Sequence, residues 1–159
     1  MWISSRMCAA SYGNIMVACW REQVTAEDVR ALFPVTDEML GRYPRGFGTM
    51  SLVEQGTFAT DEAREVGGRQ MFDLGDRLLC TSSVLLGAGF WIAAARASTA
   101  LIGLISRRPR PTRLTASIAD AAAWQAPLLG EPDGEAIEAA ALEPFAAALL
   151  EAFRARAAG

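Results

Sequence analysis

The chain of 159 residues contains no histidine, so the commonest general base and the usual zinc ligand are both missing. Serine–histidine and cysteine–histidine nucleophile pairs are excluded with it. Lysine is absent too: all 15 basic residues are arginines, set against 18 acidic residues, for a net charge of −3. This mild acidic balance argues against nonspecific binding of nucleic acid. We therefore expect a protein that is not an enzyme, binds no metal and carries no cofactor.

A clean membrane-spanning segment is also lacking. The longest apolar stretch, residues 83–105, is interrupted by Gly87, Gly89 and Arg96, and an arginine at mid-bilayer costs roughly 2.5 to 3.5 kcal/mol. We predict strand, glycine turn and helix there and no membrane span, with a transmembrane helix as the alternative. The first residues do not resemble a signal peptide, and three cysteines, an odd number, suit reduced thiols. The expected location is cytoplasmic.

The N-terminal residues are typical of a β-hairpin. Residues 1–11 and 15–22 are strand-like, and a turn-forming segment separates them. With Gly13 at the first central position of a type II′ turn, Cys8 faces Cys19 across the hairpin. Such a pair can form a disulfide under oxidation, but we favour two small, half-buried core side chains.

Helix and strand signals alternate along the rest of the chain. A helix is expected to begin at Thr25 and to be divided by Pro34. Further strands are predicted over residues 47–55, 79–86 and 113–117, and further helices over 36–42, 60–78, 90–105, from 117 onward, and 135–158 with an interruption at Pro144. The pattern predicts an α/β domain over residues 1–130: a mixed sheet of about four to five strands, starting with an antiparallel hairpin, with helices packed on it. Residues 131–159 are expected to form an extra C-terminal helical segment that packs on the same domain.

The C-terminal segment carries an apolar stripe at four-residue spacing, formed by Ile137, Ala141, Phe145, Leu149 and Phe153. A stripe of this kind usually packs on its own domain. Alternatively, the stripe forms an interface with a partner protein or with a second copy of the chain. We keep a homodimer formed through the C-terminal helix as that second hypothesis.

This order of elements resembles the STAS domain, the fold of bacterial anti-sigma-factor antagonists, over residues 15–124. The local likenesses are Gly46-Phe47-Gly48 entering the second core strand, residues 89–96 entering a long helix, the arginine loop Arg107-Arg108-Pro109-Arg110-Pro111, and residues 117–124 after the last strand. The resemblance implies a module that works by binding. Such modules dock on a kinase or regulator, sit in larger signalling assemblies or, in lipid-binding relatives of similar architecture, hold an apolar ligand.

One departure from the STAS pattern concerns phosphorylation. In the antagonists a phosphorylatable serine follows an aspartate at the start of the helix after the second core strand. The corresponding stretch here, residues 55–62, reads Gln-Gly-Thr-Phe-Ala-Thr-Asp-Glu and holds no serine. Asp61 and Glu62 would repel an added phosphate, and Thr60 fits the role of a helix cap. A phosphorylation switch is therefore not expected.

Together these features predict a non-catalytic regulatory or scaffolding module that acts through contacts with a protein partner. The candidate contact residues are Thr57, Thr60, Asp61 and Glu62, with Arg107, Arg108 and Arg110 of the arginine loop as a second patch. The alternative is a small apolar-ligand or lipid-binding domain whose site is lined by Phe90, Trp91 and Trp124. Nucleotide binding is not expected, because the glycines at 87 and 89 lack the third glycine of the dinucleotide fingerprint and the lysine of a P-loop.

Overall fold

The computed structural model describes residues 4–88, 93, 110–130 and 136–157. Its main sheet has the strand order β1-β2-β4-β6-β7, with β1 at Met7–Tyr12, β2 at Ile15–Trp20, β4 at Phe47–Val53, β6 at Leu78–Leu85 and β7 at Thr112–Thr115. β1 pairs antiparallel with β2, and every other neighbouring pair is parallel. The chain is therefore an α/β protein with a mixed, five-stranded sheet that begins with an antiparallel hairpin, as the sequence predicts.

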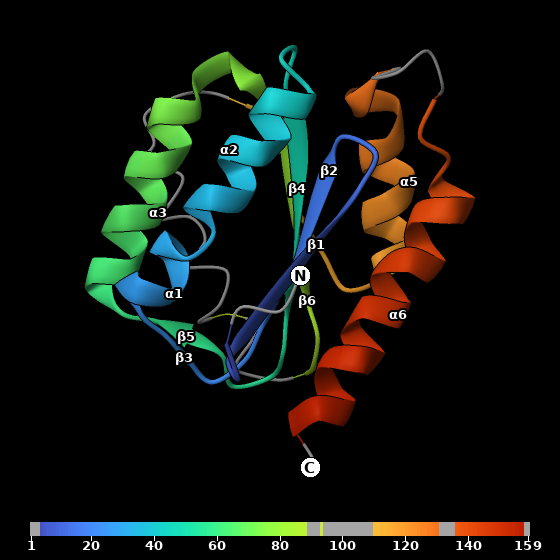
Figure 1. Ribbon diagram of the computed structural model, residues 1–159. Helices are drawn as coiled ribbons and strands as arrows, with labels where there is room; N and C mark the ends of the chain where they lie inside the picture. Colours follow the sequence, from blue (N-terminus) through green and yellow to red (C-terminus); the bar gives the residue numbers. More distant parts are fainter. Residues whose placement is uncertain (1–3, 89–92, 94–109, 131–135, 158–159) are drawn as a thin grey trace.

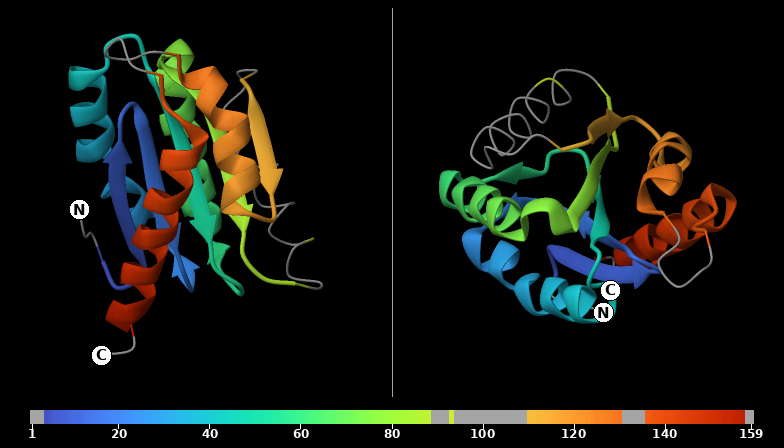
Figure 2. Two further views of the ribbon diagram at one scale, coloured as in Figure 1. Left: turned by 90° about the vertical axis from the view of Figure 1, so that its right-hand side faces the viewer. Right: turned by 90° about the horizontal axis from the view of Figure 1, so that it is seen from above.

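Helices cover both faces of this sheet (Figures 1 and 2). On one face lie α1 (Ala26–Arg30), α2 (Phe33–Arg42) and α3 (Asp61–Leu74), the last followed by a short 3₁₀ turn, η1 (Gly75–Arg77); on the other lie α5 (Ile118–Leu129) and α6 (Ala139–Ala157). A second, parallel sheet pairs β3 (Gln23–Val24) with β5 (Phe58–Ala59). This small sheet was not predicted, and it lies at the end of the molecule towards which the C-terminal part of α6 points (Figure 1).

The β1–β2 hairpin has the register that its two-residue turn predicts, with Cys8 opposite Cys19. Gly13 has a φ of 51°, the left-handed conformation that the first central position of a type II′ turn requires. Both cysteines and Cys80 are fully buried, and their thiols are free. All three side chains belong to the core.

Two apolar layers hold the helices to the sheet. On the α5 and α6 face, strand side chains including Val17, Met50 and Leu52 pack against helix side chains: Ala121, Ala122, Leu129, Leu142, Ala146, Leu150 and Phe153. On the other face, a second cluster joins α2 to the sheet: Leu32, Val35, Met39 and Tyr43 pack with Met16, Ala18, Phe47 and Leu78. β2 and β4 thus contribute to both layers, as central strands of a sheet covered on both sides do.

Two helices differ in their bounds from the sequence-based expectation. α2 begins at Phe33 instead of Thr36, because Pro34 fits the first turn of a helix. The backbone N–H groups of the first turn have no acceptor within the helix, so a proline there removes no helical hydrogen bond. α3 is continuous through Gly67-Gly68 and ends at Gly75, whose φ of 59° stops the helix.

The C-terminal helix also differs from its prediction. Pro144 does not interrupt it, and α6 is one helix over its full length. A proline inside a helix costs about 3 kcal/mol, but the apolar face of α6 is buried along the helix and offsets that cost. Leu142, Ala146 and Leu150 are buried on this face. The predicted stripe packs on the same core: Ile137 and Phe153 are buried, and Phe145 and Leu149 are partly buried.

Some predictions fall outside the described residues. These are the helix over residues 90–105, Phe90 and Trp91 within it, and Arg107 and Arg108 of the arginine loop. Within the described ranges, no helix combines the length and the apolar character needed to cross a bilayer.

Candidate interaction surface at β5 and the start of α3

The four predicted contact residues lie in one continuous segment beyond the carboxyl end of β4 (Figure 1). The Thr57 side chain is buried, and its hydroxyl donates to the carbonyl oxygen of Trp20 at 3.2 Å. Thr60 caps α3, where its hydroxyl oxygen accepts from the backbone N–H of Ala63 at 3.1 Å. The two threonines therefore fix the backbone of this segment, and the carboxylates that follow face solvent.

Phe58 is the most exposed large apolar side chain in the described part of the protein, at 56%. In the β3–β5 sheet, Ala59 lies opposite Val24, and both take part in a small apolar cluster with Val29 of α1. Successive side chains of a strand point to opposite faces, so Phe58 and its neighbour Gln23 are turned outward. The burial of the inner pair therefore forces the aromatic ring into solvent.

Two exposed carboxylates follow Phe58 along the chain, at Asp61 and Glu62. The side chain of Asp61 is 97% exposed and that of Glu62 is 66% exposed, and each pairs with an arginine. Arg64 pairs with Asp61 and also donates to the carbonyl of Ala59 at 2.6 Å, while Arg30 meets Glu62 at 3.0 Å. Ion pairs this exposed contribute at most about 1 kcal/mol to stability and leave the carboxylates available to a partner.

A strained residue positions the segment. Glu22, between β2 and β3, has a φ of 58°, and no other non-glycine residue in the described ranges has a positive φ. For such residues the left-handed conformation costs roughly 1–2 kcal/mol. The carbonyl of Glu22 accepts the N–H of Phe58 at 3.0 Å. The strained backbone at Glu22 thus holds β5 in place by a main-chain hydrogen bond, and the Glu22 residue itself is exposed.

A nearby polar cluster fastens α6 to the sheet. The buried guanidinium of Arg21 lies 3.5 Å from the centre of the Phe153 ring and donates to the carbonyl of the same residue. Glu54 lies between Arg21, at 3.9 Å, and Arg154, at 2.6 Å. Cation–ring and ion-pair contacts of this kind join β2, the end of β4 and the last turns of α6. These charged groups therefore have a structural role.

The other predicted site residues are separate from this surface. Arg110 donates to the carbonyl of Met71 at 2.8 Å and so ties the start of β7 to the end of α3. Trp124 is half-buried against the core, with the guanidinium of Arg113 at 5.9 Å from its ring. The arginine patch and the apolar-ligand site both remain predictions, since their other members, Arg107, Arg108, Phe90 and Trp91, lie outside the described residues. In the described ranges, no group of three or more potential metal ligands comes together.

Comparisons with known proteins find no matching family model, no matching curated protein and no matching solved structure. The likeness to STAS domains therefore rests on the order of elements and on the local motifs of this chain. The class that the fold defines is an α/β protein with a mixed five-stranded sheet between two helical layers.

Proposed function

We propose that this protein is a non-catalytic regulatory or scaffolding module that binds a partner protein through a surface centred on Phe58. This surface, called the Phe58 surface below, consists of Glu22, Gln23, Phe58, Asp61 and Glu62. The observation that carries the proposal is the 56% exposure of an aromatic side chain on a backbone fixed by two threonine hydrogen bonds. Aromatic residues are enriched at the centres of protein interfaces, and polar residues are typical of their rims.

The composition of the Phe58 surface indicates the chemistry of its partner. A single aromatic ring favours an apolar socket, and complete burial of a phenylalanine side chain contributes roughly 1.5–3 kcal/mol. The exposed carboxylates of Asp61 and Glu62 favour basic groups around that socket. Charge complementarity of this kind mainly sets the orientation and the association rate. The expected partner is a protein with an apolar socket and a basic rim.

The resemblance to STAS domains supports the same surface. In the antagonists, the segment after the second core strand carries the regulatory serine, and in this chain that segment carries Phe58. Because the serine is absent, the proposed recognition depends on apolar contact and charge and not on phosphorylation.

The proposal is tested by comparing what co-purifies with three forms of the full chain from the cells that make it. These are the native chain, Phe58→Ser and the matched control Phe72→Ser, whose phenylalanine on α3 is 44% exposed. Truncation of an interface hot spot costs at least about 2 kcal/mol, so the partner should fall by more than tenfold with Phe58→Ser. With Phe72→Ser its recovery should match that of the native chain. Since the two side chains are each about half exposed, Phe58→Ser and Phe72→Ser remove similar buried areas, and their free energies of unfolding in urea should lie within about 1 kcal/mol of each other.

Equal recovery of the same proteins with Phe58→Ser and with the native chain would contradict the proposal. Native mass spectrometry of the same preparations distinguishes this proposal from the alternative function, the binding of a small apolar ligand. A mass increase of one small apolar molecule per chain, with no associated protein, would favour the ligand-binding hypothesis.

A further inference from the structure

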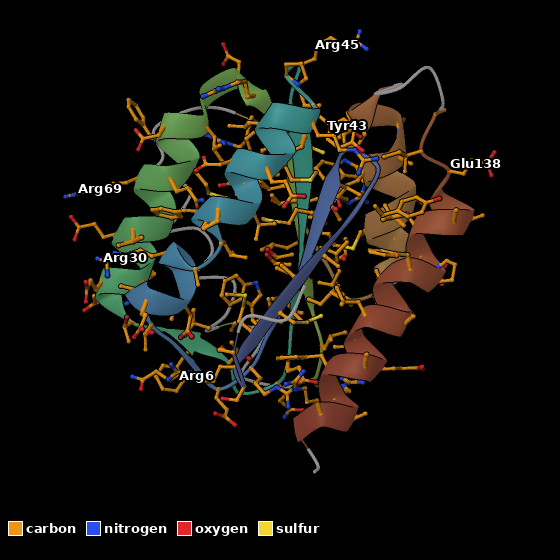
Figure 3. All side chains as sticks on the ribbon, viewed as in Figure 1. Arg6, Arg30, Tyr43, Arg45, Arg69 and Glu138 are labelled. Atoms are coloured by element: carbon orange, nitrogen blue, oxygen red, sulfur yellow. The ribbon has the colours of Figure 1, made fainter. Side chains whose placement is uncertain are left out.

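The end of the molecule opposite to β3 and β5 carries a hollow of about 370 Å³. Its walls come from the β1–β2 turn, the segment 42–46 between α2 and β4, the start of β6 and the last residues of α5. Figure 3 shows Tyr43 and Arg45 at this end, and Figure 1 shows β5 at the other. We infer that the hollow receives Phe58 of a second copy of the chain, so that copies join head to tail. This inference rests on the proposed function, because it names the partner of the Phe58 surface.

The wall of the hollow is mainly apolar. Four aliphatic side chains line it together with Tyr43: Pro44, Leu79, Leu128 and Leu129. Leu128 is 38% exposed, so this end of the molecule leaves a large apolar side chain in solvent. A cavity of roughly 150 Å³ is enough to hold benzene. The hollow therefore has room for one phenyl ring and offers it apolar contacts.

The described residues at the rim of the hollow carry positive charge. Arg42 is exposed, and its guanidinium lies 5.3 Å from the centre of the Tyr43 ring. Within the described part of the chain, no carboxylate forms an ion pair with Arg42 and none lines the hollow. Arg45 also lines the hollow but is engaged in an interaction of its own, so the inference uses only the guanidinium of Arg42.

The Phe58 surface complements this rim. Its aromatic ring is followed within four residues by the exposed carboxylates of Asp61 and Glu62. A guanidinium favours carboxylates, and complementary charges around an apolar contact fix its orientation. The hollow thus has the two properties that the Phe58 surface requires of its partner, an apolar socket and a basic group at the rim.

Phe58 and the hollow lie too far apart to meet within one chain. The hollow is at the amino ends of β4 and β6, while Phe58 follows the carboxyl end of β4. β4 has seven residues, and a strand rises about 3.3 Å per residue, so the length of this strand, roughly 20 Å, separates the two features. The contact is therefore made between copies. Because it joins two different surfaces at opposite ends of the molecule, it leads to open rows of copies and not to a closed dimer.

Sedimentation velocity of the full chain tests this inference. At roughly 10 μM to 1 mM, where small transient interfaces form, the native chain should give dimers and longer species whose share rises with concentration. Phe58→Ser should weaken the association by at least about tenfold, and Arg42→Glu by at least about fivefold. The matched controls Phe72→Ser and Arg69→Gln replace exposed side chains of α3 and should associate as the native chain does.

A mixture of the two defective variants is the most specific test. Arg42→Glu keeps an intact Phe58 surface, and Phe58→Ser keeps an intact hollow. One interface of the native kind can therefore form between the two variants, and no third copy can be added. The equimolar mixture should give dimers and no longer species, at concentrations where each variant alone is monomeric.

The inference is overturned by a native chain that stays monomeric over this range, by a mixture that stays monomeric, or by association that is unchanged in Phe58→Ser or in Arg42→Glu. If the chain is monomeric but Phe58 still binds a different protein, the inference fails and the proposed function stands. If Phe58 contacts neither a second copy nor another protein, both fail.

Discussion

Gln125 on α5 is fully buried and joins its helix to two strands of the sheet. Its amide nitrogen donates to the carbonyl of Thr49 at 2.8 Å, and its amide oxygen accepts from the hydroxyl of Ser82 at 2.7 Å. The amide nitrogen also donates to the Sγ atom of Cys80 at 3.6 Å. Gln125→Leu keeps a side chain of similar size but removes all three hydrogen bonds. Each buried polar group that loses its partner costs about 1–3 kcal/mol, and the added apolar contact offsets part of that cost. We expect the free energy of unfolding to fall by about 2–4 kcal/mol.

Urea unfolding of a double-mutant cycle measures this network. The cycle consists of the native chain, Gln125→Leu, Ser82→Ala and the double variant. In Ser82→Ala the amide oxygen of Gln125 loses its donor. In the double variant the carbonyl of Thr49 and the weak acceptor Cys80 Sγ lose their donor, as they do in Gln125→Leu. The sum of the two single effects should therefore exceed the effect of the double variant by at least about 2 kcal/mol, because the hydroxyl of Ser82 and the amide oxygen of Gln125 each lose a partner only in a single variant. Gln70→Leu is a matched control, because its amide donates at 3.1 Å to Thr36 in a partly buried position, and it should cost less than about 1 kcal/mol.

The reasoning would be refuted by either of two results. One is additivity of the two single effects within about 0.5 kcal/mol, which would mean that the side chains do not interact. The other is a Gln125→Leu variant as stable as the native chain, which would mean that the buried carbonyl and hydroxyl need no partner from α5.

Three further substitutions test local features of the fold by urea unfolding. Gly46→Ala should lower the free energy of unfolding by more than about 2 kcal/mol, because the φ of Gly46 is 119° and the new Cβ would lie 2.5 Å from the carbonyl oxygen of Arg77. A decrease of less than about 1 kcal/mol would contradict this geometry. Gly41→Ala, inside α2 with nothing within 4 Å of its Cβ, should instead stabilise by about 0.5–1 kcal/mol, and a loss would contradict the open position. Burial raises the pKa of the Cys80 thiol above 9.0, so its contribution to stability is present below pH 9 and lost as the pH rises and the unfolded chain ionises. Above pH 9 the free energy of unfolding of Cys80→Ala should therefore fall less steeply with pH than that of the native chain, by up to about 1.4 kcal/mol per pH unit. Equal slopes for the two forms would contradict the raised pKa.

Local signals predicted much of the fold. The two-residue turn at Gly13 sets the hairpin register, and with it the pairing of Cys8 and Cys19. Thr60 caps a helix as predicted, and the helices expected to begin at Thr25 and at residue 117 are capped by Thr25 and Ser117. A side-chain oxygen that accepts from a backbone N–H acts within four residues of sequence, so such starts can be predicted. Features determined by neighbouring residues could therefore be predicted from the sequence.

Features that depend on distant pairing could not be predicted in this way. β3 and β5 have two residues each, too few for an alternation to show, so the outward position of Phe58 has no local signal. The sequence indicated the capping role of Thr60 but gave no sign that the hydroxyl of Thr57 donates to the backbone of Trp20, which lies 37 residues earlier. The hollow lined by Asn14, Tyr43, Leu79 and Leu129 likewise has walls from four segments that are far apart along the chain. Only the folded arrangement brings them together.

The central claim is that the Phe58 surface contacts a partner protein, and site-specific photo-crosslinking in the native cells tests it most directly. The chain has no lysine for amine-reactive crosslinkers, so a photoreactive phenylalanine analogue is placed at position 58 or, as a control, at position 72. We predict a covalent adduct with one defined protein from position 58 and none with that protein from position 72. No adduct at position 58, or the same adducts from both positions, would contradict the account.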